Sequence, residues 1–396
     1  MSTSKYLLAL SGVVMSLPLI AAAQPQAIAV GAMKLIPTVN VQHKYDDNIF
    51  SQAADEVSSS ITTLKPQLQL LADQDANQVA LTYRGDYGRY ASSSDDNYAD
   101  HTFSLDASLE ANDQNRFAIN GSFAKLHDAR GEGSSEGVIA SSRAEPDEYD
   151  AQSLSGIYDF GRASSLLGIE LSADTTDIEY QNNLAETQFR NRTDTGLAGK
   201  LYGRLAPKTR FFVALAQTDI EYDKLPLSGE TLNGEEQNVS VGADWDITGK
   251  TSGSVQIGRL SKDFDDAVRS DANLTTWNAA LNWTPRTYST ISLSAAKKPS
   301  ETNGTGSFIE RSDYSAQWNH AWSDDLRSNL NVGFGKDDYA DDPRSDDRAS
   351  YGFSVSYDVD RWINVSAGYS YTERDSNNNT FDFERSQVML SVNLNL

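Results

Sequence analysis

The sequence predicts an all-β protein, a transmembrane antiparallel up-and-down β-barrel of the bacterial outer membrane, on three observations. The final residues place apolar side chains at every second position: Val388, Leu390, Val392, Leu394 and Leu396. Successive side chains of a strand point to opposite faces, so this segment has one apolar and one polar face. The other two observations are an apolar leader at the N-terminus and a regular alternation of long and short connections.

The leader has the layout of a secretory signal peptide. Lys5 precedes an apolar run from Tyr6 to Ile20, and three alanines then offer a small-residue cleavage site. The run is too short for a comfortable helical span. We therefore predict three parts: a signal peptide (1–23), a short periplasmic leader (24–34) and a single barrel domain (35–396).

Composition narrows the class further. The chain has 396 residues, 39% of them hydrophobic, and contains no run of about twenty apolar residues. It has no cysteine, which excludes disulfides and thiolate metal sites. A formal net charge of -23 argues against nucleic acid as a partner, because phosphates attract a basic surface.

The barrel should contain about eighteen strands, an even number as in bacterial single-chain barrels. The expected strands are 35–46, 58–72, 78–90, 99–111, 115–127, 146–160, 164–178, 188–205, 209–222, 235–247, 251–263, 271–284, 288–300, 307–322, 326–338, 347–358, 362–374 and 380–396. Segments 58–72 and 271–284 are the weakest, and without them the count falls to sixteen. The first and last connections are long, which predicts that both termini lie on the short-turn, periplasmic side.

The long connections are rich in Asp, Glu, Ser and Gly, as expected of extracellular loops. They include Asp47–Val57, Asp128–Glu145, Asp223–Gly234 and Tyr339–Asp346. Their acidic clusters favour solvated loops over cation sites. The longest, around 128–146, is a candidate to fold inward as a constriction.

A barrel of this size leaves room for an aqueous lumen. The residues predicted to line it combine both charges with tyrosine: Arg84, Asp86, Tyr90, Asp106, Glu110, Lys200, Tyr202 and Arg204. A ring of one sign would indicate ion selectivity, and this mixture does not. The tyrosines either stack weakly on sugar rings or fill space in the wall.

Four tryptophans lie near predicted short turns and are expected to form the periplasmic aromatic girdle: Trp245, Trp283, Trp322 and Trp362. His320, flanked by Trp318 and Trp322, belongs to the same belt. The alternation slips around Phe211–Phe212 and near Phe381 and Phe383, which predicts bulges or lumen-facing aromatics there.

The sequence gives little support for a catalytic, metal-binding or cofactor-binding site. The four histidines lie far apart, and we predict no catalytic residue, no metal site and no cofactor. The pair His127–Asp128 at the outer rim is the one candidate for an outer-membrane hydrolase, because such enzymes place His and Asp on barrel walls. A general base needs a partner within hydrogen-bond reach. A solvated loop edge is the favoured interpretation.

The first predicted strand runs into Asp47-Asn48-Ile49-Phe50. This motif resembles the strand and acidic first loop of the bacterial family called putative β-barrel porin 2. The resemblance implies an outer-membrane conduit for exopolysaccharide or capsular polysaccharide, working beside a periplasmic polysaccharide-export protein. It brings no catalytic residues.

Two other functions remain open: a general diffusion porin for small hydrophilic solutes, and a structural or surface-binding barrel with a closed lumen. All three place the chain in the outer membrane of a Gram-negative bacterium, among lipids and lipopolysaccharide. The chain end resembles the signal read by the barrel-assembly machinery, although Leu396 stands where that signal prefers Phe.

Overall fold

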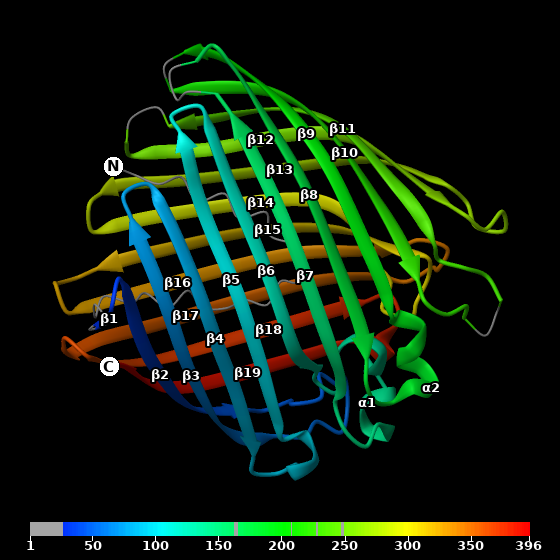
Figure 1. Ribbon diagram of the computed structural model, residues 1–396. Coiled ribbons are helices and arrows are strands. Elements are labelled where there is room, and N and C mark those ends of the chain that lie inside the picture. Colours follow the sequence, from blue (N-terminus) through cyan, green and yellow to red (C-terminus); the bar gives the residue numbers. More distant parts are fainter. Residues whose placement is uncertain (1–26, 162–164, 207, 227–228, 247–248) are drawn as a thin grey trace.

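The computed structural model describes residues 27–161, 165–206, 208–226, 229–246 and 249–396 (Figure 1). Within these ranges, eighteen strands form one closed barrel in which each pairs antiparallel with the next and β19 pairs back with β2. They are β2 (Met33–Asp46), β3 (Ser59–Gln74), β4 (Asn77–Tyr90), β5 (Tyr98–Asn112), β6 (Asn115–Asp128), β7 (Asp147–Phe160), β8 (Leu167–Tyr180), β9 (Arg192–Ala206), β10 (Thr209–Tyr222), β11 (Gly234–Asp246), β12 (Thr251–Phe264), β13 (Ala272–Arg286), β14 (Ser289–Glu301), β15 (Phe308–Ala321), β16 (Leu326–Tyr339), β17 (Ser345–Asp360), β18 (Ile363–Ser376) and β19 (Phe383–Asn395).

The predicted fold class and strand number are therefore confirmed, and both weak segments lie in the wall, as β3 and β13. Three expected strands start at least three residues later than the sequence pattern indicated, and one of them, expected from residue 164, begins at Leu167. Residues before Arg192 form helical turns, α2 (Leu184–Thr187) and η3 (Gln188–Arg190). Residues before Phe383 form η4 (Asn379–Phe381), whose first turn is capped by the side chain of Asn378.

The predicted signal peptide lies outside the described residues. The expected leader contains one short strand, β1 (Ile28–Val30), which pairs with the beginning of β2. β2 itself begins at Met33, two residues before the expected start of the barrel.

The two faces of the wall follow the alternation in the sequence. Val388 and Leu390 of β19 are exposed on the outer surface, and Phe103 of β5 and Phe353 of β17 are exposed in the same way. The slip at Phe211–Phe212 has a simple cause. Phe211 is exposed, whereas Phe212 is buried beside Tyr202 on the inner side, next to a register shift at Thr209. This is one of the lumen-facing aromatics that the pattern allowed.

The two ends of the barrel differ. Short turns, β1 and the C-terminus lie at one end, and the long connections lie at the other with α1 (Ile139–Ser142) and α2, as Figure 1 shows. The 3-10 turns η1 (Ser94–Asp96) and η2 (Gly133–Ser135) also belong to long connections. We call these the turn end and the loop end. No helix among the described residues is long and apolar enough to cross a membrane.

Candidate functional site

The inner wall is uncharged at mid-height over ten consecutive strands, β11 to β19 and β2. Inward positions here carry amides and hydroxyls that bond to one another across neighbouring strands. Examples are Asn40 to Asn393 at 2.6 Å, Gln42 to Ser391 at 3.1 Å, Gln256 to Ser240 at 2.7 Å, Ser294 to Ser315 at 2.6 Å and Asn329 to Asn319 at 2.8 Å. We call this surface the neutral arc. It offers many weak hydrogen-bonding positions and no charge.

Several charges on the neutral-arc strands lie towards the two ends in ion pairs. Near the loop end, the buried ammonium of Lys262 lies 2.7 Å from Glu301 and 3.0 Å from Glu236. Near the turn end, Arg327 bonds to Asp358 at 2.6 Å. Opposite charges at these distances cancel most of each other's field, so neither end of the arc presents a ring of one sign.

All eight predicted lumen residues occupy inward positions, but on the opposite arc, and their environments differ. Arg84 donates to Gln67 at 3.0 Å, and Asp86 pairs with Lys65 at 2.7 Å while accepting from Tyr98 at 3.1 Å. Asp106 and Glu110 are exposed on the inner face of β5. This arc therefore carries the charges that the sequence pattern singled out.

The two predicted lumen tyrosines are packed. Tyr202 is buried against Phe212, donates to Glu170 at 3.0 Å and lies under the guanidinium of Arg210 at 4.6 Å. Tyr90 packs on the buried cluster beneath the loop-end mouth. Their contacts fit the space-filling interpretation rather than stacking on a passing sugar.

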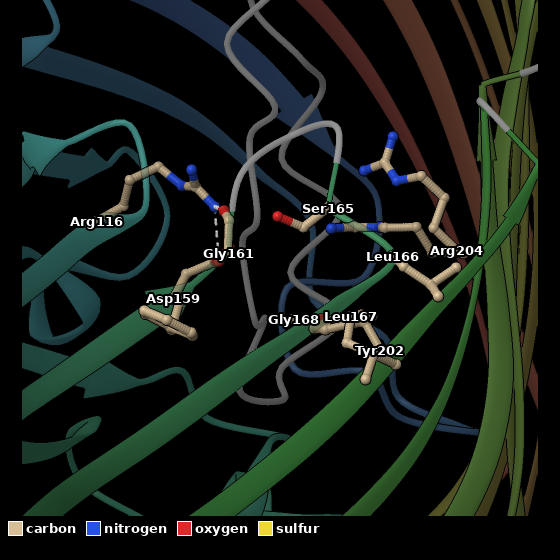
Figure 2. Close-up of a pocket in the computed structure, with 11 residues that line it drawn as sticks. Arg116, Asp159, Gly161, Ser165, Leu166, Leu167, Gly168, Tyr202 and Arg204 are labelled. Atoms are coloured by element: carbon tan, nitrogen blue, oxygen red, sulfur yellow. Dashed lines mark hydrogen bonds and ion pairs between the residues drawn. The ribbon is translucent and has the colours of Figure 1, made fainter.

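Tyr202 and Arg204 lie near the turn end, beside a small cavity lined by residues from β6 to β10, and Lys200 is two residues before Tyr202 on β9. Figure 2 shows Arg204 beside Tyr202 and, across the cavity, Arg116 with Asp159. Arg116 bonds to Asp159 and to the Gly161 carbonyl, each at 2.7 Å. Lys200 pairs with Glu170 at 3.0 Å. Arg116 and Lys200 therefore have carboxylate partners, and these pairs are part of a structural charge network.

The connection between β6 and β7, residues 129–146, folds across the loop-end mouth, as its length suggested. We call it the crossing loop. Ala140 of α1 is fully buried in a cluster with residues of the first long connection, and Gly137 lies against the β18–β19 connection. Glu136 accepts a 3.0 Å hydrogen bond from Asn303 in the β14–β15 connection, on the far side of the barrel ring from β6 and β7.

Glu136 holds the tip of the crossing loop. One carboxylate oxygen lies 2.9 Å from Arg344, and the other accepts a 2.8 Å bond from Arg374. Both arginines are buried, and Glu136 is also largely covered. Sequence reasoning missed all three residues, because they are far apart in the chain and no local pattern marks them.

The electrostatics of Arg344 favour a permanent charge. Burial by itself lowers the pKa of its guanidinium, but hydrogen bonds to Asp346 and the nearby Glu136 carboxylate outweigh that effect and raise the pKa above its usual value. Arg344 bonds to Asp346 at 3.0 Å. The ion pair with Glu136 therefore does not depend on titration of the arginine.

The motif Asp47-Asn48-Ile49-Phe50 joins the barrel seam to the crossing loop. The buried Asn48 side chain donates to the carbonyls of Gln52 at 2.8 Å and Glu384 at 2.9 Å. Asp47 accepts from the Ser386 amide at 2.7 Å. Phe50 lies under the guanidinium of Arg130 at 4.1 Å. The motif thus ties the first long connection to β19 and provides the surface on which the crossing loop rests.

A substitution at Gly131 should dislodge the crossing loop. Gly131 has φ +91°, and an added Cβ would lie 1.9 Å from the Phe50 carbonyl oxygen. Gly131→Val is therefore expected to displace the loop, which proteolysis of intact cells detects as faster cleavage within 129–146. Gly156→Val, at a glycine with open space and ordinary φ, is the control. Equal cleavage of the two variants would show that the loop does not rest on Phe50.

The four predicted girdle tryptophans all lie near the turn end. Trp283, Trp322 and Trp362 are exposed, and Trp245 is half-buried. The ring of His320 lies 4.3 Å from that of Trp322 and 5.2 Å from that of Trp318, between ring centroids. Their location on the periplasmic side remains a prediction.

His127 has a different partner from the one considered in the sequence. Its Nδ1 lies 2.9 Å from Asp100, and its ring stacks on Tyr98 with centroids 4.0 Å apart. Asp128 instead accepts bonds from Tyr180 at 3.0 Å and Arg190 at 3.1 Å. Within the described residues, no group of three or more His, Asp or Glu side chains is placed to hold a metal ion.

Comparisons with known proteins agree with this architecture. A family model described as putative beta-barrel porin 2 matches residues 21–396, which include the first-loop motif and the whole barrel. The comparison with curated proteins found no match.

Among solved structures, the chain is similar to OccK3 (OpdO) of Pseudomonas aeruginosa, with 10% identity, a TM-score of 0.49 and coverage of 91% of this chain and 95% of that one. It is also similar to OpdK of the same organism, crystallised with vanillate, with 12% identity, a TM-score of 0.47 and coverage of 91% and 98%. It is similar as well to the FrpB iron transporter of Neisseria meningitidis, with 10% identity, a TM-score of 0.45 and coverage of 86% of this chain and 62% of that one. Likeness at this level carries no functional argument.

Proposed function

Because the chain belongs to the putative β-barrel porin 2 family of outer-membrane barrels, we propose that it is the conduit through which a polysaccharide leaves the cell. The neutral arc is the observation that carries the proposal. A hydrated sugar chain can exchange its water hydrogen bonds for bonds to amides and hydroxyls with little net change in free energy. Binding along a transport path must stay weak, and an arc of wall without charge at mid-height meets that condition.

This role assigns functions to both ends of the barrel. At the turn end, the short turns face the periplasm and receive the polymer from a periplasmic polysaccharide-export protein. The girdle tryptophans hold that end at the inner surface of the membrane. At the loop end, the crossing loop covers the exit.

A general diffusion porin for small hydrophilic solutes is the second candidate, and the crossing loop is the observation that favours it. A loop held across the mouth by buried ion pairs can act as a fixed constriction that excludes large solutes. The two functions differ in what passes: a long polymer requires the loop to move, whereas a small solute requires only a gap beside it.

Deleting the gene and measuring surface and periplasmic polysaccharide tests the proposal. We expect loss of surface polymer and accumulation inside, both restored by the wild-type gene. Ser294→Trp and Ser315→Trp together, which put bulk on the neutral arc, should restore secretion poorly, whereas Leu293→Trp on the outer face should restore it fully. Unchanged polymer after deletion, with conductance of small ions in planar bilayers, would instead support the diffusion porin.

A further inference from the structure

We propose that Arg344, Arg374 and Asn303 form a carboxylate-binding site at the barrel mouth, and that Glu136 of the crossing loop is its displaceable resident occupant. The observation is that one side chain of the crossing loop satisfies donors from three separate elements, at 2.8 to 3.0 Å. The inference deepens the proposed function and rests on it in one respect: the competing ligand is the carboxylate group of a transported polymer.

The receiving side of the site is built without the crossing loop. The guanidinium of Arg344 lies between the rings of Phe381, at 3.7 Å, and Tyr339, at 4.4 Å. Arg374 donates to the Phe381 carbonyl at 2.7 Å and lies 4.8 Å over the ring of Phe383. These contacts all come from β16, β19 and the connections beside them. The two guanidinium groups therefore stay in place when Glu136 leaves.

The charges identify the class of ligand. Without Glu136, the site contains two guanidinium groups and the Asp346 carboxylate, which leaves a surplus of one positive charge. A guanidinium fork matches the two oxygens of a carboxylate, and the amide of Asn303 adds a third donor direction. A neutral sugar can accept hydrogen bonds from these donors through its hydroxyl oxygens, but it brings no negative charge to offset the surplus positive charge.

The crossing loop can release its tip without unfolding. Its stems are held separately: Arg130 bonds to Asp96 at 2.7 Å, and Arg143 bonds to Glu186 at 2.7 Å. Beside Glu136, the tip exposes Val138 and Ile139. Loss of the Glu136 contacts removes the ion pairs that hold this segment between its two stems. The tip then uncovers the exit by leaving the packing contacts of Gly137 and Ala140.

Because Glu136 is attached to the crossing loop, only some carboxylates can compete with it for the site. An occupant on a short loop has an effective concentration on the order of millimolar, so a dilute monocarboxylate does not displace it. A polymer with repeated carboxylates, as in a polyuronate, presents a comparable local concentration once it is inside the lumen. The site thus favours an acidic polymer over its monomer.

The experiment measures time-averaged conductance of the purified full-length barrel in planar bilayers. Polygalacturonate, added on the turn-end side, should raise conductance by about tenfold. This is the change in the ratio of open to closed barrels expected when one charge-assisted hydrogen bond of the closed loop is lost. Dextran of equal length and galacturonate monomer at equal residue concentration should not. Glu136→Gln should give the high conductance without any polymer. Arg374→Gln should also be open at rest and should lose the response to polygalacturonate.

Glu132→Gln is the matched control. Glu132 lies in the same loop, is exposed, and has only a long contact of 4.0 Å to Arg385. It should behave like the wild type. Equal effects of polygalacturonate and dextran, or wild-type conductance in Glu136→Gln, would overturn the site. Either result would leave the deletion phenotype intact, whereas normal secretion after gene deletion would overturn the proposed function and leave the conductance data standing.

Discussion

Leu293→Arg is expected to prevent most of the protein from reaching the folded, membrane-inserted state. Leu293 lies near the middle of β14 on the outer face, where it is exposed and pairs with Leu281 and Ala316. A charged side chain at the bilayer midplane costs about 2–4 kcal/mol on the lipid face of a barrel. The measurement is the folded fraction in outer-membrane extracts, together with urea unfolding of the purified protein in liposomes.

Ser294→Arg, at the next residue, is the control for this prediction. Ser294 is exposed on the inner face and bonds to Ser315. An arginine there reaches the aqueous lumen, so folding should be close to that of the wild type. If both variants fold equally well, the assignment of the two faces of β14 is wrong.

Lys262→Ala is expected to destabilise the barrel by about 3–5 kcal/mol, the cost of leaving buried carboxylates without their cation. Lys262 is 1% exposed and holds Glu236 and Glu301 from two other strands. Glu301 also accepts a 2.6 Å bond from Tyr222, so the loss would extend to β10. Urea unfolding of the purified barrel, followed by tryptophan fluorescence, gives the change in the free energy of unfolding.

The comparison for Lys262 is Lys336→Ala. Lys336 pairs with Asp338 at 2.9 Å, but the two side chains are 52% and 47% exposed. Water screens such a pair, and we expect less than about 1 kcal/mol from its removal. A loss at Lys262 no larger than the loss at Lys336 would show that the buried cluster does not stabilise the wall.

The strands were predictable because their signal is local. Alternation over a few residues, as in Val388 to Leu396, states both that a strand is present and which face meets lipid. The errors fell where local turn chemistry replaced alternation. The segment before Arg192 forms helical turns, and Asn378 caps a turn where a strand was expected.

The candidate site was only partly predictable. Inward positions such as Arg84 and Lys200 follow from the same alternation. The packing of Tyr202 against Phe212 does not, because it depends on the register of β9 against β10. The sequence pattern marked the motif Asp47 to Phe50 but did not indicate that it supports a loop from another part of the barrel.

The sequence by itself determined the class of protein, its eighteen strands, the inner and outer faces of the wall and the end at which long connections gather. These properties depend on the period of the side-chain alternation, on the lengths of the connections and on composition. Tertiary structure alone decided which residues hold the crossing loop over the mouth. Glu136 meets Arg374 across 238 residues and Asn303 across 167. Such contacts exist only after the barrel closes, because closure of β19 on β2 brings the loops of opposite walls within reach of one side chain.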